Sequence, residues 1–317
     1  MNDNWRGKYL NAIIHGDCLN LVKDIPTETI DLVIADPPYF KVIGEKWDYA
    51  WRTLDEYIDW SIQWIEKVSR ILRLGGTFYL FGYLRVLAHI IPKLVDYGLE
   101  FKQQIIIDKG IQAVSGRATK NYTIFPNTTE SILFIIKDNK QWLKQFLKEK
   151  QIEKGWSSKQ INEKLGVKSN GGGMWSIYTG KNVCEQFPTK ERWAQFENIF
   201  DYTLDYEKVS QTFNPIMGYT NVWSDIDFYK EKRIHPTQKP IKLIQRLIQA
   251  SSNPNDIILD PFMGSGTTAA VAKILNRNYI GFEINQEYVE KSQMRLKDLD
   301  FETSLIKKQD LPLDKFL

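Results

Sequence analysis

An acid, two prolines and an aromatic residue follow directly on a short apolar run near the start of the chain. The run covers residues 30–35, and Asp36, Pro37, Pro38 and Tyr39 come after it. Proline has no backbone N–H, so the turn presents carbonyl acceptors with few competing donors. The residue before each proline is held extended, which aims the Asp36 side chain outward. A flat ring with an exocyclic amine could donate its hydrogens to Asp36 and a backbone oxygen while Tyr39 stacks on it. A solvated turn at a strand end explains the pattern equally well.

A glycine-rich turn lies between a second apolar run and a helical pattern near the other end of the chain. The run 257–260 ends in Asp260, and helical spacing covers 269–275. Between them lie Phe262, Gly264, Ser265, Gly266, Thr267 and Thr268. Such a strand–turn–helix unit lets a ligand approach the backbone closely and directs free N–H groups at negative charge. The next apolar run ends in Glu283, about 20 residues after the glycines, the spacing of an acid that binds ribose hydroxyls.

The same glycine turn fits a second class of cofactor. Residues 264–269 match G-x-G-x-x-[GA], the dinucleotide fingerprint, and Glu283 would serve the ribose of NAD as well. A nucleotide P-loop is excluded because no Gly-Lys-[Ser/Thr] follows at the required spacing. The combination with Asp36 and Tyr39 disfavours an NAD-dependent oxidoreductase, since hydride transfer has no evident use for a proline-framed amine clamp.

Together the two motifs resemble those of DNA amino-methyltransferases that use S-adenosylmethionine. The clamp precedes the glycine turn, an order that resembles the circularly permuted beta class of that family. Three more segments match in order: 15–19 with Asp17 and Cys18, whose acid in the family contacts the cofactor adenine; 74–80, a Gly-Gly-strand element; and 235–240 with His235, Thr237 and Lys239, which precedes the last cofactor-binding helix.

The resemblance implies a function and its residues. It implies methyl transfer from S-adenosylmethionine to the N6 amine of a flipped-out adenine in double-stranded DNA, with Asp36, Pro37, Pro38 and Tyr39 as the catalytic clamp. The implied cofactor contacts are Asp17, Cys18, His235, Thr237, Lys239, Asp260, Phe262, Gly264, Ser265, Gly266, Thr267, Thr268 and Glu283. An aspartate at the first clamp position resembles adenine enzymes and a serine the N4-cytosine ones. Both rings offer a similar amine, so an N4-cytosine enzyme stays open, as does a non-catalytic DNA-binding protein.

Composition sets broad limits. The 317 residues suffice for one large domain with an insertion. Cys18 and Cys184 are too few for a disulfide framework or a zinc cluster, which predicts a reduced, cytoplasmic setting and no metal. No apolar run has membrane-spanning length. A cognate restriction endonuclease and a homodimer stay open as partners, because nothing in the sequence indicates either.

Charge is unevenly distributed along the chain. The formal net charge is +3, yet residues 137–192 hold 12 Lys and Arg against 6 Asp and Glu. A basic segment in a near-neutral fold indicates a polyanion such as DNA, although a solvated helical face also explains it. The residues expected to contact DNA are Lys109, Arg117, Lys120, Trp175 and Lys181.

The alternation of apolar runs and helical spacing predicts a doubly wound, mostly parallel α/β sheet of the Rossmann-like methyltransferase type. Expected strands are 31–35, 77–81, 101–107, 131–136, 257–259 and 279–283; expected helices are 54–72, ended by Gly75-Gly76, 84–96, a stretch around 241–248, and 269–275. Residues 1–137 and 216–300 are predicted to form the catalytic domain, and 301–317 a tail. Both motifs fall at the carboxyl ends of strands, where ligands bind in such sheets.

Residues 138–215 break this alternation and are predicted to form an inserted, largely helical target-recognition region. Residues 157–166 have the pattern of a capped short helix, and 174–178 could supply the second helix of a helix-turn-helix. The glycines at 171–173 disfavour a stable recognition helix, so a flexible loop is the alternative.

Overall fold

The computed structural model describes residues 4–40, 50–114, 123, 125–167, 173–180, 186–229 and 238–298. Five residues that the sequence analysis assigns to ligand binding lie outside these ranges: Arg117, Lys120, Lys181, His235 and Thr237. The predicted tail, 301–317, also lies outside them.

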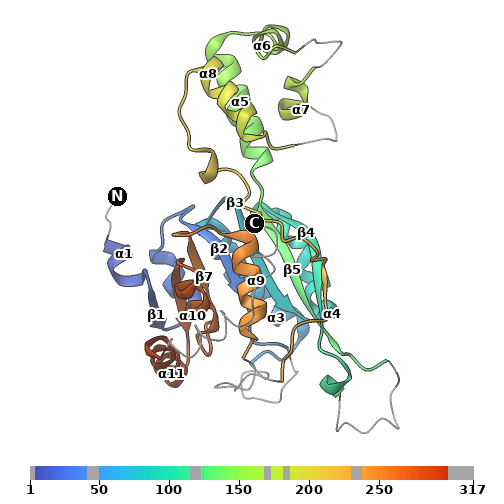
Figure 1. The fold of residues 1–317 in the computed structure, drawn as a ribbon, viewed down its shortest axis with the longest axis vertical. Coiled ribbons are helices and arrows are strands. Elements are labelled where there is room, and N and C mark those ends of the chain that lie inside the picture. Colours follow the sequence, from blue (N-terminus) through green and yellow to red (C-terminus); the bar gives the residue numbers. More distant parts are fainter. Residues whose placement is uncertain are drawn as a thin grey trace.

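Strands from both ends of the chain form one sheet (Figure 1). In chain order they are β1 (Ala12–His15), β2 (Ile30–Ala35), β3 (Leu72–Gly82), β4 (Leu99–Asp108), β5 (Thr129–Lys137), β6 (Val222–Trp223), β7 (Ile257–Asp260) and β8 (Asn278–Glu283). Their order across the sheet is β1-β8-β7-β2-β3-β5-β4-β6. All neighbours are parallel except β5, which runs antiparallel to β3 and β4. The predicted doubly wound, mostly parallel sheet is confirmed.

Helices cover both faces of the sheet. On one face lie α1 (Asn4–Tyr9), α2 (Cys18–Leu21), the 3₁₀ turn η1 (Val22–Asp24), α3 (Leu54–Ile71) and α4 (Leu84–Ile90), and on the other lie α9 (Ile241–Ser251), α10 (Thr267–Ile274) and α11 (Gln286–Lys297). Because side chains alternate along a strand, β2 sends Val33 into one core and Leu32 and Ile34 into the other. No helix in the described ranges is long and apolar enough to cross a membrane.

Two predicted boundaries are wrong. Gly75 and Gly76 lie inside β3, which begins at Leu72 directly after α3. The register of pairing with β2 shifts between Leu72 and Thr77, and Gly75, which lies between them, takes φ +68°. The predicted helix 84–96 divides into α4 and the 3₁₀ turn η3 (Ile91–Tyr97). Pro92 lies at this boundary and has no N–H to continue α-helical bonding.

The described helices between Lys140 and Lys208 form a separate group, called here the helical unit, whose core also includes Leu74 of β3 and Val209. It contains α5 (Lys140–Lys154), α6 (Ser158–Lys164), α7 (Trp175–Thr179), α8 (Lys190–Phe200) and η5 (Tyr206–Lys208). The chain enters and leaves at one place, where Asn139 Nδ2 donates to the Val209 carbonyl at 2.8 Å. Arg73 fixes the exit by donating to the Ser210 carbonyl at 2.8 Å and to Thr212 Oγ1 at 2.9 Å.

The helical unit lies at the end of the sheet opposite to the carboxyl end of β2. Because β5 is antiparallel, Glu130 at its start lies level with the end of β3, whereas Lys137 leads into the unit at the other end. The exit segment packs there too, since a Cβ on Gly75 would lie 2.5 Å from the Ser210 backbone. The cavity end and the helical-unit end of the sheet are separated by the stretch of β3 from Gly75 to Gly82. This stretch has eight residues and spans roughly 25 Å. Figure 1 shows the unit extending away from the sheet.

The structure corrects two expectations for this region. Trp175, predicted to contact DNA, is 1% exposed, packs in the core of the helical unit and donates from Nε1 to Gln151 Oε1. The helix-turn-helix is also wrong, because α7 has only five residues and buries both Trp175 and Thr179. Trp175, which was predicted to contact DNA, is therefore a core residue of the helical unit.

Candidate active site

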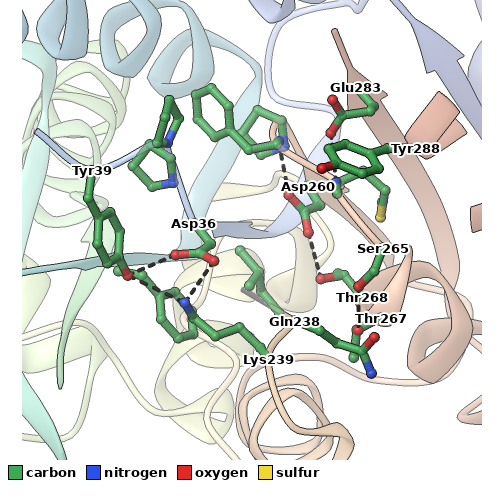
Figure 2. A pocket seen from close by; sticks show the side chains of 18 of the residues that line it. Asp36, Tyr39, Gln238, Lys239, Asp260, Ser265, Thr267, Thr268, Glu283 and Tyr288 are labelled. Atoms are coloured by element: carbon green, nitrogen blue, oxygen red, sulfur yellow. Dashed lines mark hydrogen bonds and ion pairs between the residues drawn. The ribbon is translucent and has the colours of Figure 1, made fainter. Parts of the chain in front are cut away.

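The carboxyl ends of β2 and β7 open into one cavity of about 600 Å³ (Figure 2). These neighbouring strands lie where the strand order reverses: β8 and β1 continue on one side, and β3 on the other. Ligands of open α/β sheets bind at this kind of switch point. The proline turn lies on one side of the cavity and the glycine turn on the other, as Figure 2 shows.

A tyrosine that the sequence analysis did not single out holds the proline turn in place. Tyr57, on α3, donates its hydroxyl to the Pro38 carbonyl at 2.9 Å. Asp36 follows β2 with 24% of its side chain exposed, and Oδ1 accepts a hydrogen bond from Tyr39 at 2.8 Å. The carboxylate therefore lies at the cavity wall in a fixed orientation.

A lysine and a glutamate complete the surroundings of Asp36. Lys239 Nζ lies 2.8 Å from Asp36 Oδ2 and 2.9 Å from Glu130 Oε1. The Tyr39 hydroxyl also lies 2.5 Å from Glu130 Oε1. Lys109 Nζ is 3.6 Å from Glu130 Oε2. Two carboxylates and two ammonium groups thus form one cluster, which is half-buried except for the buried Glu130 and which we call the clamp cluster: Asp36, Tyr39, Lys109, Glu130 and Lys239.

Burial and pairing set the protonation of this cluster. Burial raises the pKa of Asp36, and Glu130 adds to the rise, while the Lys239 ammonium opposes it. For Glu130 burial acts in the same direction, but Lys239 and Lys109 together hold the pKa down to about 2. The pKa of Lys239 is raised against burial by its two carboxylate partners. Glu130 and Lys239 are therefore ionised at neutral pH.

The glycine turn presents a second acidic wall. Glu283 Oε2 accepts from the Gly264 N–H and Oε1 from the Asn285 N–H, both at 2.8 Å. Gly266 has φ +77°, and a Cβ there would lie 2.7 Å from Ser292 Cβ on α11. Only glycine allows this close approach, so the turn and the start of α10 keep their shape.

Asp260 is buried beside this turn. Its carboxylate accepts from Thr268 Oγ1 at 2.6 Å and from the Phe262 N–H at 3.0 Å. Burial raises its pKa to about 7, and Asp36 and Glu283 contribute to the rise. Among the described residues no lysine or arginine pairs with Asp260. A carboxylate in this state favours a ligand with a positive group.

The segment after β1 supplies the third wall. Asp17 caps α2 by accepting from the Leu19 N–H at 2.9 Å, and it lines the cavity together with Cys18. Burial raises the pKa of the Cys18 thiol to about 12, so this cysteine is an unreactive packing residue. Asp17, Asp260 and Glu283 give one side of the cavity three carboxylates. This donor-poor, acceptor-rich wall fits the ribose hydroxyls and cationic groups of S-adenosylmethionine.

Most residues that the sequence analysis assigns to the site line this one cavity. They are Asp17, Cys18, Asp36, Pro37, Pro38, Tyr39, Lys109, Lys239, Asp260, Phe262, Gly264, Ser265, Thr267, Thr268 and Glu283. Gly266 supports the turn from behind. Lys239 was expected at the cofactor, but its ammonium faces Asp36. Lys109 was expected to contact phosphate, but it is 20% exposed and lies against Glu130.

Several cavity residues were missed. The aromatic ones are Trp51, Trp60, Phe81, Tyr83, Phe228, Tyr229, Phe282 and Tyr288. Glu130 was not singled out, although the sequence carries a signal for it: this acid is the second residue of an otherwise apolar strand, and that end of an antiparallel strand meets the carboxyl ends of its parallel neighbours. In the described ranges no cluster of His, Cys, Asp and Glu could hold a metal ion.

The fold and the cavity define a doubly wound α/β protein that joins an amine clamp to a nucleotide-binding turn. The sequence profile of the DNA methylase family matches residues 30–294. The chain therefore belongs to this family and is a DNA methyltransferase, as the motif pair predicted.

Named relatives match along nearly the whole chain. The DNA adenine methyltransferase YhdJ of Escherichia coli K12 is 32% identical over 300 residues, covering 92% of this chain and 84% of its own. The type II methyltransferase M.HinfI of Haemophilus influenzae is 28% identical, covering 92% and 69%.

Solved structures share the fold. The M1.HpyAVI–SAM complex aligns with a TM-score of 0.54 and 22% identity, covering 90% of this chain and 98% of the other. The cytosine-N4-specific PvuII DNA methyltransferase aligns with a TM-score of 0.57 and 17% identity, covering 93% and 89%.

Proposed function

We propose that this protein transfers a methyl group from S-adenosylmethionine to the N6 amine of an adenine flipped out of double-stranded DNA. One observation carries the proposal: Asp36 of the proline turn and the acids of the glycine turn line the same cavity. The names of the similar proteins support adenine as the target, since YhdJ is a DNA adenine methyltransferase.

The acidic wall would hold the cofactor. Glu283 offers two oxygens, each with one backbone donor, and so keeps acceptor capacity for ribose hydroxyls. Asp260 offers a buried carboxylate to a cationic group. When bound, S-adenosylmethionine supplies an electrophilic methyl group on a sulfonium. Because Thr268 and the Phe262 N–H orient the Asp260 carboxylate, the wall needs little rearrangement on binding.

The proline turn would activate the amine. Asp36 and the Pro37 carbonyl each accept one amine hydrogen, which favours a tetrahedral nitrogen whose lone pair leaves the ring system. The nitrogen becomes positive as it is methylated, so an ionised Asp36 stabilises the transition state more than the ground state. Burial raises the pKa of Asp36, and this allows the same carboxylate to take the proton that the methylated nitrogen then loses.

The base must leave the duplex to reach this cavity. Unstacking and unpairing cost a few kcal/mol. Stacking on aromatic side chains is worth about 1–3 kcal/mol for each base. Tyr39 and Phe228 line the cavity and offer such rings. The Tyr39 hydroxyl is committed to Asp36 and Glu130, so its ring is fixed before the base arrives.

The direct test is to identify the product. The wild-type protein is incubated with labelled S-adenosylmethionine and mixed-sequence duplex DNA, and the nucleosides are analysed by mass spectrometry. We expect N6-methyladenine, and Asp36→Ala should make none while still binding the cofactor. N4-methylcytosine as the product would overturn the choice of base, and the absence of any methylated base would overturn the proposal.

A further inference from the structure

We propose that Lys239 is a positioning residue for this methyl transfer: it holds Asp36 in the base-free site, then yields Asp36 Oδ2 to the incoming amine and stays on Glu130. The proposal rests on the proposed function and adds a step to it. Lys239 comes two residues before α9, and its side chain reaches Asp36 and Tyr39 (Figure 2).

The contacts show that the base-free clamp is already filled. Asp36 Oδ1 accepts from the Tyr39 hydroxyl at 2.8 Å, and Oδ2 faces Lys239 Nζ at 2.8 Å. The Lys239 side chain is 11% exposed, and its ammonium lies 5.4 Å from the centre of the Tyr39 ring and 5.1 Å from that of Phe81. An amine that donates to Asp36 must enter the space that this ammonium occupies.

Charge explains why Lys239 must move away. The target nitrogen becomes cationic during transfer, and an ammonium on the same carboxylate would oppose that charge. Without Lys239 in the empty site, however, Asp36 would be a half-buried carboxylate beside Glu130 with no cation in contact, and such a group takes up a proton more readily. The site needs the lysine before the base arrives and needs it displaced afterwards.

Glu130 supplies the second position. Its Oε1 lies 2.9 Å from Lys239 Nζ, so a small rotation of the lysine leaves it paired. Glu130 is 4% exposed, and its Oε2 faces Lys109 at 3.6 Å, which keeps it ionised throughout. Its contacts with Lys239 and Lys109 therefore give the buried Glu130 a role in the proposed step.

Charged and polar groups from several elements of the fold surround Asp36. Lys239 and Tyr39 contact it, and Glu130 lies behind both. Lys109 is farther away, beyond Glu130. Asp260 across the cavity and Tyr57 beneath the turn interact with it electrostatically. Within the described part of the chain, Lys239 is the cation in direct contact, so its removal should shift the titration of Asp36 most.

The test is the pH dependence of the single-turnover rate with saturating cofactor and DNA. Transfer needs ionised Asp36, so the rate falls as the pH falls through the pKa of that group. Lys239→Met should move this acidic limb up by about one pH unit or more, which slows transfer about tenfold or more at pH values below both limbs. On the alkaline plateau most of the rate should return. Lys239→Arg, the charge-conserving control, should keep the limb near its wild-type position.

Glu130→Gln provides the opposite test. With one carboxylate fewer, Asp36 becomes easier to ionise and Lys239 has Asp36 as its one charged partner. The acidic limb of the pH–rate profile should move to lower pH. Transfer should nevertheless be slower on the plateau, because Lys239 then stays on Asp36 and the amine does not displace it. Limb shifts of opposite sign in Lys239→Met and Glu130→Gln would not follow from general damage to the fold.

The alternatives are distinguishable. If the wild type is active and the acidic limb is unshifted in both variants, the role of Lys239 is overturned. The proposed function then still stands. A rate of Lys239→Met that stays low at every pH, with normal cofactor affinity, also overturns it. A wild type that methylates no base overturns the proposed function itself.

Discussion

At the proline turn, Asp36 must accept a hydrogen bond from a neutral amine and then face a nitrogen that becomes cationic. Asp36→Asn removes the charge and keeps the shape. We expect single-turnover transfer to fall by about 10²–10³-fold, because the lost interaction is strongest in the transition state. Cofactor affinity, measured by calorimetry, should change little. A variant with more than a tenth of the wild-type rate would contradict the role of this carboxylate.

Asp260 leads to a prediction about pH and the cofactor. Its pKa is about 7, raised by burial, and a cationic ligand favours the ionised form. Binding should therefore release a proton, and affinity should rise about tenfold per pH unit below pH 7 and level off above it. Calorimetric titrations between pH 5.5 and 8.5 measure this. Asp260→Asn should bind weakly with a flat profile over this range; a wild-type slope in that variant would contradict the assignment.

The same shift has a consequence for stability, with a definite sign. Asp260 titrates near an ordinary value of 3.8 in the unfolded chain and about 7 in the folded one. The folded protein therefore binds this proton more tightly, so the contribution of Asp260 to stability is present below pH 4 and is lost as the pH rises through 7. Bound cofactor reverses this loss. The thermal shift produced by cofactor should accordingly be larger at pH 8 than at pH 6.

Sequence reasoning worked best where a function depends on neighbours in the chain. Asp36 and its prolines, or Gly264 and Gly266, are close in sequence, and their chemistry follows from local geometry. Lys239 and Glu130 meet Asp36 only after three distant segments pack together. Lys239 was therefore assigned to the cofactor with the rest of its motif, although its ammonium faces the clamp.

At the scale of elements, the helices after the two motif strands hold the cavity walls at fixed distances. The Gly266 turn touches Ser292 so closely that an added methyl group would separate α10 from α11. Gly266→Ala, which also strains a φ of +77°, should lower the free energy of unfolding by about 1–3 kcal/mol and weaken cofactor binding. Urea denaturation measures the first effect and calorimetry the second.

Gly7 offers a matched control for that substitution. It lies in α1, and a Cβ there would have nothing within 4 Å. Gly7→Ala should leave unfolding unchanged or raise its free energy by up to about 1 kcal/mol, since alanine favours helix. Equal losses in both variants would mean that the close approach at Ser292 has no special effect.

Element types were more predictable than their ends and partners. The periodicity of residues 54–72 predicted α3 well, because an amphipathic stripe is a local property. Gly75 and Gly76 were misread as a helix stop because their reason is tertiary: the chain segment that leaves the helical unit crosses β3 there. Trp175 was misread for the same reason, since sequence alone does not tell a core tryptophan from a stacking one.

For the whole molecule, the arrangement of the helical unit changes how its basic residues are understood. Residues 138–215 were predicted to form a target-recognition region. The helical unit that they contain lies roughly 25 Å from the cavity, at the opposite end of β3. Lys109, which follows β4, and Gln238 and Lys239, which precede α9, line the cavity instead. DNA that reaches the helical unit must therefore extend well past the flipped base.

This separation predicts that the catalytic sheet works without the helical unit. Its two ends meet at Asn139 and Val209, so residues 140–208 can be replaced by a few glycines and serines. The shortened protein should bind S-adenosylmethionine within about threefold of the wild-type affinity, because the described residues assigned to the cofactor lie at the other end. Its DNA affinity should depend less steeply on salt if the lysines of the unit contact phosphates. A tenfold loss of cofactor affinity in a shortened protein that still unfolds cooperatively would show that the two ends of the sheet are coupled.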